Sequence, residues 1–358
     1  MFAEIRARVL GAIKKIATAE ALTARFLGVI RHRVVKHRRR GPLVRGRVDD
    51  LTVWRDNTNP TLQERLNKAL SVVCLESEIP IVTGYAQCAQ GLMKMHDRGY
   101  SEIVFAQIAA TTQAREAIIH KEFHLSSADP HDVGENNVVK IGKTSYDVCD
   151  HLSNLDMEAI HPMAARILRK ANIPLRVKHA FEQKDSGTVI SVEGGPKERV
   201  EMITGLPVQT LRVCDPDMVG MKGYDATILE ALTKHDVWIV SKQTNANTIT
   251  HHLQTNPKAL EKVASDILAK HPKADLHIDN LHLVAAVGTD FGERNVLLES
   301  LMALEENNVS VKGAQQGPNN NDVQCLVSRS DALKATKALH KGLVEDCCVT
   351  HDKLQQAA

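Results

Sequence analysis

The stretch MEAIHPMAARILRKANIPLRVKHAF, residues 157–181, decides the fold. Its His161-Pro162 pair predicts the start of a helix, because proline suits the first helical turn. We therefore interpret His161 as a structural residue and not a catalytic one. Asn172 stands where a helix C-cap belongs, and the apolar segment that follows it predicts a strand. With SYDVCDHLSNL just upstream, the pattern is two helices and then a strand. Such alternation is typical of an α/β layer with a largely parallel sheet.

The sequence before this stretch continues the alternation. Residues 61–71 predict a helix, residues 72–85 (VVCLESEIPIVTGY) predict strands around an exposed turn, and residues 85–115 are mostly helical in pattern. REAIIHKEFHLSSADP, residues 115–130, predicts a buried strand, then a loop and a turn at its Asp-Pro end. The first thirty residues also have helical spacing of apolar side chains.

The sequence after this stretch contains an internal repeat. Two units that start 73 residues apart each predict the order β-α-β-β-α. The first unit has strands at 208–214, 237–242 and 246–253 and helices at 224–235 and 256–270; the second has strands at 281–287, 309–314 and 322–328 and helices at 293–307 and 330–345. This order is typical of a small ferredoxin-like module, in which two helices cover one face of a sheet. The free sheet edge of such a module can pair with a second copy.

Length and composition are those of a globular protein of two or three domains. Of 358 residues, 43% are apolar and 25% charged. No run reaches the roughly 18 apolar residues of a membrane span, and the N-terminus lacks the pattern of a secretory signal. The seven cysteines show no CxxC spacing, which favours reduced thiols in the cytoplasm over disulfides or a zinc site. The adjacent pairs His251-His252 and Cys347-Cys348 point to different faces, so we predict no metal-binding residues.

One segment has a strong charge bias. Residues 31–47 hold eight Lys and Arg and no Asp or Glu, although the net charge of the whole chain is only +2. Eight cations can bind nucleic acid through its phosphates. The run has no interleaved aromatic residues and no nucleic-acid-binding fold around it, so a solvated basic segment is the favoured interpretation and nucleic-acid binding the less favoured one.

The repeat and residues 157–181, followed by Gly187-Thr188-Val189-Ile190, resemble the regulatory half of aspartate kinases and its link to the kinase domain. IPIVTGY (79–85) and DRGYSE (97–102) resemble two segments of that kinase domain. REAIIHKEFHLSSADP and DMVGMKGYD (217–225) are similar to the aspartate kinases associated with ectoine synthesis. The resemblance implies an α/β fold, a partial amino-acid-kinase domain followed by two ferredoxin-like ACT domains. The implied boundaries are 1–47 for an irregular basic segment, 48–195 for the kinase part, and 200–275 and 276–350 for the ACT domains.

The resemblance also implies an activity, the transfer of the γ-phosphoryl group of ATP, with magnesium, onto the side-chain carboxylate of L-aspartate. Both reactants are anionic, so the site must supply cations and backbone N–H donors. Arg98 is the candidate for gripping the carboxylate, with Ser101 and Glu102 beside it as catalytic residues. Glu102 stands where the family has Asp. Gly84 would let the chain pass close to the substrate. The alternatives are a surface turn with a solvated arginine and an ordinary turn glycine.

The family's nucleotide-side loop corresponds to residues 120–131. Lys121, Ser126, Ser127 and Asp129 are the candidate ATP-binding residues. His131 replaces the family's arginine, and HKEFH (120–124) replaces a Thr-Asp-Val-Asp-Gly-type stretch. A solvated loop with a Ser/Asp turn is the alternative interpretation.

The loop of residues 216–225 is the candidate effector site. It presents backbone N–H groups at a helix N-terminus, where the carboxylate of an amino acid can bind. In the family this region binds an inhibitory amino acid, which implies lysine or threonine here, and the ACT domains imply a homodimer. The alternative is a plain β-α connection. The candidate effector-binding residues are Asp217, Gly220, Gly223, Tyr224, Asn245, Asn247 and Thr248, the last three expected on the following strand.

Aspartate kinases open with a Lys-Phe/Tyr-Gly-Gly-Thr-Ser motif that holds the phosphates, and this chain contains none. The resemblance therefore implies that the 358-residue chain alone turns over slowly, as an N-terminally truncated kinase. An amino-acid-sensing subunit without catalysis is the alternative function, since sensing needs only the repeat.

Overall fold

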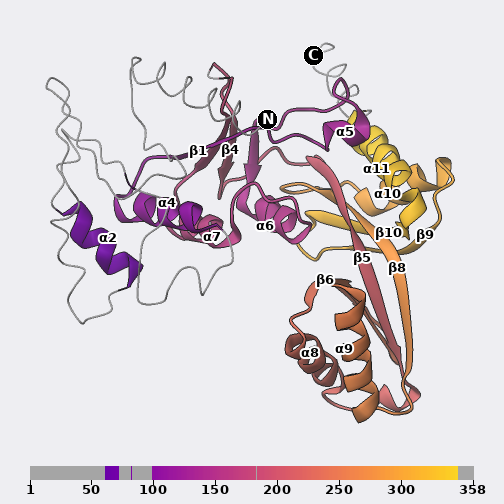
Figure 1. Cartoon of the computed structure of the whole chain (residues 1–358). Helices are drawn as coiled ribbons and strands as arrows, with labels where there is room; N and C mark the ends of the chain where they lie inside the picture. The colour runs from indigo at the N-terminus through magenta and orange to yellow at the C-terminus, as the bar shows by residue number, and fades with distance from the viewer. Residues whose placement is uncertain (1–60, 72–81, 83–98, 183, 346–358) are drawn as a thin grey trace, which may run out of the picture. The chain divides into compact units, whose positions relative to one another are not determined.

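The computed structural model describes residues 61–71, 82, 99–182 and 184–345 (Figure 1). The N-terminal helix, the basic run, Gly84 and Arg98 lie outside these residues, as does most of the segment predicted as strands at 72–85. The chain forms two compact units. The first has residues up to Leu125 together with 140–153 and 158–195, and the second has 126–139, 154–157 and the residues from 196 onward.

The first unit is a mixed α/β layer, as predicted. Its sheet has the order β1-β3-β4-β2, in which β1 pairs with β3 and β2 with β4 in parallel, and β3 with β4 antiparallel. Helix α4 packs against α7 through Ile103 and Val104. The elements are α2 (Leu62–Leu70), α4 (Tyr100–Thr111), β1 (Ala117–Lys121), β2 (Lys143–Ser145), α6 (Tyr146–Asn154), α7 (Pro162–Lys170), β3 (Leu175–His179) and β4 (Thr188–Ser191).

Helix α7 begins and ends where the sequence predicts. The ring of His161 accepts a hydrogen bond from the Met163 N–H, and Pro162 occupies the first helical position. Past the other end, Asn172 has a left-handed φ of 53° and donates its N–H to the Arg169 carbonyl. Both ends are thus closed by local hydrogen bonds, which confirms the predicted helix start at His161-Pro162.

Strand β1 differs from the prediction of a buried strand. Only Ala117 among its five residues is buried. Among the strands of the described residues, β1 is an outer strand that pairs only with β3, and outer strands bury less of their length.

The second unit contains a six-stranded antiparallel sheet of order β6-β7-β5-β8-β10-β9 (Figure 1). The predicted β-α-β-β-α order occurs twice. The elements are α5 (Pro130–Val133), β5 (Met202–Cys214), η3 (Pro216–Met218), α8 (Tyr224–Lys234), β6 (Trp238–Thr244), β7 (Thr248–Gln254), α9 (Pro257–Lys270), β8 (Asp275–Val287), α10 (Val296–Glu306), β9 (Val311–Gln316), β10 (Asp322–Ser328), η4 (Arg329–Asp331), α11 (Ala332–His340) and η5 (Lys341–Glu345). The single helix predicted for 330–345 is thus a 3-10 turn, an α-helix and a π turn.

The two repeats share their two longest strands. Strand β5 pairs with β8 over thirteen residues, from Met202 opposite Val287 to Cys214 opposite Asp275. Strand β7 covers only residues 209–214 of β5, and β10 covers only residues 281–287 of β8. Each repeat therefore completes its own four-stranded sheet with half of the other repeat's first strand. We call the two halves the first module (α8, α9) and the second module (α10, α11).

Both helix pairs cover the same face of this sheet. Leu211 and Val213 of β5 pack under α8 and α9, whereas Ile203 packs under α10 and α11. All three are odd-numbered residues of one strand, so they point to one side. The prediction of two helices on one face is confirmed for each module.

The halves of β5 and β8 that join the modules lie outside the strands predicted at 208–214 and 281–287. Pro207 lacks an N–H, but β7 pairs only with residues 209–214 of β5, so no hydrogen bond is lost on that side. Residues 275–280 of β8 are mostly polar and exposed, because they form the outer strand of the first module.

Candidate functional site

The turn that precedes α4 is fixed by a glycine. Gly99 is the N-cap residue, with a left-handed φ of 77°. A Cβ at this position would lie 2.3 Å from Cδ2 of His161, well inside contact distance. Helix α4 therefore starts directly against the start of α7, and only glycine permits the approach.

Glu102, in the first turn of α4, joins two other elements. Its Oε2 accepts a hydrogen bond from the His161 N–H at 2.6 Å, and its Oε1 accepts one from Nζ of Lys121 at 2.9 Å. The side chains of Glu102 and Lys121 are partly buried, with about a fifth of each exposed. The structure thus brings together a predicted catalytic residue and a predicted ATP-binding residue. Those roles stay predictions.

Lys121 lies at an edge of the sheet where ligands commonly bind. It is the last residue of β1 and stands in register with His179, the last residue of the parallel strand β3. In open α/β sheets the carboxyl ends of parallel strands line the ligand crevice. Ser101 lies half-buried in the first turn of α4, next to Glu102. Gly84 and Arg98 cannot be placed, because they lie outside the described residues.

The other predicted ATP-binding residues belong to the second unit and use their side chains locally. Ser126 donates its hydroxyl to the Ala128 carbonyl, and Asp129 caps the short helix α5 through the His131 N–H. Ser127 is fully buried, with its Oγ 2.8 Å from Nε2 of His340. Their sequence pattern is therefore explained by local structure, and their contact with a nucleotide stays a prediction.

The candidate effector loop is closed by contacts that sequence analysis missed. Asp215 accepts hydrogen bonds from the Asp217 N–H at 2.9 Å and the Tyr224 hydroxyl at 2.8 Å. The hydroxyl, foremost, and the backbone N–H hold the pKa of Asp215 below its usual range. Burial, with the hydrogen bond to Asp215 second, raises the pKa of Tyr224. The Tyr224 ring stacks on His271 at 4.0 Å. The pair Asp215-Pro216, which comes before a helical pattern, was the sequence feature that could have indicated this N-cap at Asp215.

Asn245 and Asn247 lie in the turn between β6 and β7, and not on a strand as predicted; Thr248 begins β7. The Asp215 N–H donates to the Asn247 carbonyl at 2.9 Å, so the loop and this turn are adjacent. Gly220 and Gly223 have φ of 84° and 78°, and a Cβ on either would meet open space. The predicted effector residues therefore lie on this loop and the adjacent turn, and both glycines of the loop border open space.

The first module also contains a buried polar group that the sequence did not reveal. Asp225 forms an ion pair with Lys242, and its Oδ1 lies 3.6 Å from Nε2 of the buried His251. His252, next in the strand, has a different partner, the Thr210 hydroxyl at 3.0 Å. Burial lowers the pKa of each histidine to about 4. Both rings are therefore neutral at physiological pH.

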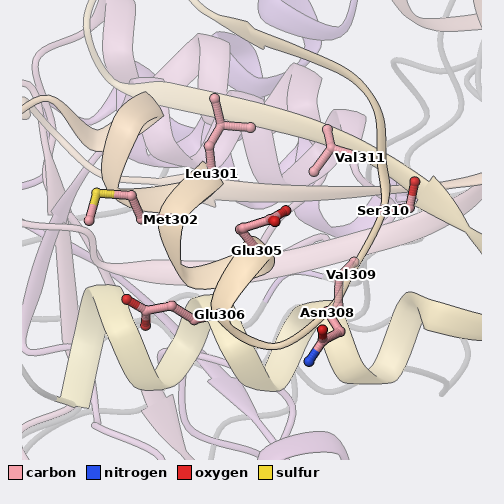
Figure 2. A pocket seen from close by; sticks show the side chains of 8 residues that line it. All are labelled: Leu301, Met302, Glu305, Glu306, Asn308, Val309, Ser310 and Val311. Carbon is pink, nitrogen blue, oxygen red and sulfur yellow. The ribbon is translucent and has the colours of Figure 1, made fainter.

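A hollow on the second module is separate from the predicted residues. It is lined by the end of α10 and the start of β9, as Figure 2 shows, and none of the predicted site residues belongs to it. Two of its lining side chains, Glu305 and Glu306, are acidic. No helix in the described parts of the chain is long and apolar enough to cross a membrane.

Comparison with known proteins defines the class. The family model "Amino acid kinase family" matches residues 16–179. The aspartate kinase Ask_Ect of Stutzerimonas stutzeri is 43% identical over 304 residues, which are 84% of this chain and 64% of that protein. The aspartokinase of Saccharomyces cerevisiae is 23% identical, over 83% of this chain and 61% of that protein. The chain thus spans less than two thirds of the length of these curated relatives.

Solved structures have the same fold. The aspartate kinase of Clostridium acetobutylicum superposes with a TM-score of 0.63 at 22% identity, covering 69% of this chain and 59% of that one. E. coli aspartokinase III in complex with aspartate and ADP superposes with a TM-score of 0.59 at 19% identity, covering 69% of this chain and 56% of that one. The chain is thus similar to the amino acid kinase family over residues 16–179. Over most of its length, its sequence is also similar to that of aspartate kinases.

Proposed function

We propose that the chain works in an aspartate kinase, which transfers the γ-phosphoryl group of ATP to L-aspartate to give 4-phospho-L-aspartate. The observation that carries this is the 43% identity to Ask_Ect. We also propose the matching context: Mg²⁺ bound with ATP, a cytoplasmic location, and the supply of phosphoaspartate to synthesis of the aspartate-family amino acids, including ectoine.

The described part of the kinase half has one feature suited to this chemistry. Lys121 is a cation at the carboxyl edge of β1, in register with the end of β3. A phosphate at that edge would compete with Glu102 for the ammonium group. Glu102 would then position the lysine, because its other oxygen stays bound to the His161 N–H at 2.6 Å.

The test measures binding and turnover separately. L-aspartate and MgATP should each raise the melting temperature of the full chain, and hydroxylamine should trap an acyl phosphate only when both are present. Lys121→Ala should weaken ATP binding, whereas Lys143→Ala, an exposed lysine on β2, should not. Stabilisation by neither ligand, with no trapped product, would reject the proposal.

We propose further that the first module is the regulatory ACT domain that binds an inhibitory amino acid, lysine or threonine. E. coli aspartokinase III has been crystallised with lysine and aspartate. In this chain the geometry of the two equivalent loops supports the first module. Gly220 and Gly223 face open space, whereas Cβ atoms on Gly288 and Gly292 of the second loop would lie 2.3 Å from the Arg199 carbonyl and 2.4 Å from Glu198.

The two loops also provide a matched control. Asp215 N–H donates to the Asn247 carbonyl in the first module, and Gly288 N–H donates to the Asn321 carbonyl in the second, both at 2.9 Å. Ligand at a hundredfold excess over its dissociation constant should stabilise the protein by about 2–3 kcal/mol. Asn247→Ala should reduce this gain and Asn321→Ala should leave it. The absence of any shift with lysine, threonine or methionine would remove the regulatory proposal, and leave the kinase proposal standing.

A further inference from the structure

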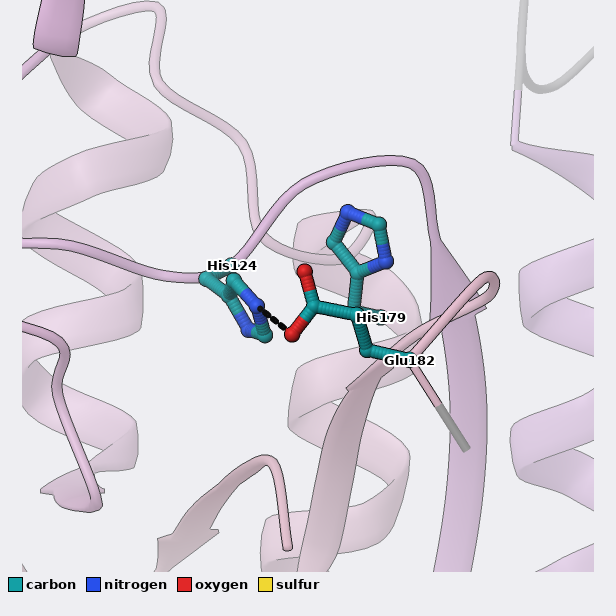
Figure 3. A group of neighbouring side chains, drawn as sticks. All are labelled: His124, His179 and Glu182. Atoms are coloured by element: carbon teal, nitrogen blue, oxygen red, sulfur yellow. Dashed lines mark hydrogen bonds and ion pairs between the residues drawn. The ribbon is translucent and has the colours of Figure 1, made fainter. Parts of the chain in front are cut away.

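Three side chains that are far apart in the sequence converge in the first unit. His124 follows β1, His179 ends β3, and Glu182 lies in the loop beyond (Figure 3). Nε2 of His124 is 3.0 Å from Oε2 of Glu182, and the two imidazole rings are 4.6 Å apart between centroids. One ligand atom from each residue lies within 4.8 Å of those of the other two.

The sheet topology creates this convergence. Strands β1 and β3 are parallel neighbours, with Lys121 opposite His179, so the segments that leave both strands emerge at the same edge. Sequence analysis predicted no metal-binding residues because it compared only adjacent histidines and cysteines. The spacing from 124 to 182 has no motif, and only strand pairing brings these residues together.

A fixed carboxylate lies beside the first histidine. Nδ1 of His124 lies 3.9 Å from Oδ1 of Asp185. Asp185 is itself held by an ion pair with Lys140 and by the Gly187 N–H at 2.6 Å. In protein metal sites a carboxylate commonly accepts the second N–H of a ligand histidine. Asp185 lies near Nδ1 of His124 in this way, at 3.9 Å and beyond hydrogen-bond distance.

The chemistry of the three groups selects the ligand. Two imidazoles and one carboxylate are the donors of three-ligand zinc sites, which keep a fourth position open. Mg²⁺ and Ca²⁺ prefer sites made only of oxygen. Nδ1 of His179 accepts a weak 3.2 Å hydrogen bond from the Phe181 N–H. Coordination through Nε2 would place the ring proton on Nδ1, so this hydrogen bond would be lost.

We propose that His124, His179 and Glu182 bind a zinc-type divalent cation with one open coordination position. The cation would connect the segment after β1 to the loop after β3. Its ligand in the first of these segments, His124, lies three residues beyond Lys121. Its binding does not depend on the proposed kinase activity.

The test uses the full chain after chelator treatment, with Co²⁺ as a spectroscopic probe. Visible absorption should show one tightly bound Co²⁺ that Zn²⁺ displaces and excess Mg²⁺ does not. His124→Ala and His179→Ala should abolish this spectrum. Glu182→Gln, at a side chain that is more than half exposed, should weaken binding without unfolding the protein. Asp185→Asn, behind His124, should weaken it by about ten- to a hundredfold.

The control is His277→Ala. His277 is an exposed histidine paired with Asp275 at 2.7 Å, and it belongs to no three-residue cluster among the described residues. It should leave Co²⁺ binding unchanged. An unaltered spectrum in folded His124→Ala and His179→Ala, as checked by circular dichroism, would overturn the proposal. So would equal loss of binding in His277→Ala.

Discussion

The hydroxyl oxygen of Ser127 lies 2.8 Å from Nε2 of His340, 213 residues farther along the chain. Both residues are fully buried, and Nδ1 of His340 is 2.8 Å from Oε1 of Glu345. The Val139 N–H also donates to the Ser127 hydroxyl at 2.9 Å. The segment 126–139 is thus attached to the end of α11 by one connected set of hydrogen bonds.

Ser127→Ala should destabilise the second unit by about 1–3 kcal/mol, because it leaves a buried imidazole nitrogen without its partner. Urea unfolding is the measurement. The neighbouring Ser126→Ala removes only a hydrogen bond to the Ala128 carbonyl, two residues away, and should cost clearly less. Equal costs for the two variants would show that the contact with His340 contributes nothing.

Glu102 and Lys121 should behave as a coupled pair. Each single alanine variant leaves the other charge partly buried without its partner, so the double variant should cost less than the sum of the two. We expect a coupling energy of about 0.5–3 kcal/mol from a double-mutant cycle in thermal unfolding. Strict additivity would mean that the 2.9 Å contact is solvated and weak.

Gly99 and Gly223 form a matched pair. Both are helix N-caps, with φ of 77° and 78°, but only Gly99 faces a nearby side chain, His161. Alanine at Gly223 should cost about 1–2 kcal/mol from backbone conformation alone. Alanine at Gly99 should cost more, because it must also displace the His161 ring. Hydrogen exchange at the first turns of α4 and α8 measures the local destabilisation by each substitution. Similar effects at the two positions would argue against the close approach of Gly99 to His161.

The second unit should lose stability in mild acid. Burial lowers the pKa of His251 and of His252 from 6.5 to about 4, so between these values the unfolded chain binds more protons than the folded one. Stability is therefore complete above about pH 6.5 and falls as the pH drops toward 4, by at most about 1.4 kcal/mol per pH unit for each ring. His282 acts in the same direction.

The check is unfolding by urea across this pH range. Replacing His251 and His252 together by glutamine should flatten the slope, even if the variant is less stable throughout. The exposed His277→Gln should keep the original slope. A double variant with an unchanged slope would assign the acid sensitivity to other groups.

A homodimer through residues 200–345 remains our expectation. Of the strands in the described sheet, β6 and β9 are the outer two, and each presents one edge that another strand can pair with. Light scattering at micromolar concentration should give twice the mass of the chain. A stable monomer would count against it.

The sequence predicted elements better than sites, for a physical reason. Periodic apolar residues placed the helices and strands of both modules, and the caps at His161 and Asn172 lie where the pattern put them. Residues 202–207 of β5 and 275–280 of β8 were not predicted as strand, because a proline and a polar run carry no strand pattern. Side-chain partnerships such as Glu102 with Lys121, or His124 with His179, depend on strand order, which local sequence does not encode.

The sharing of β5 and β8 has a consequence for how this half of the protein comes apart. Neither module is a contiguous piece of chain, because each borrows half a strand from the other. A fragment ending near residue 275 would expose the residues of β5 that pair with β8. The two modules should therefore fold and melt as one cooperative block. Attempts to excise either as a separate domain should yield an unstable, aggregating product.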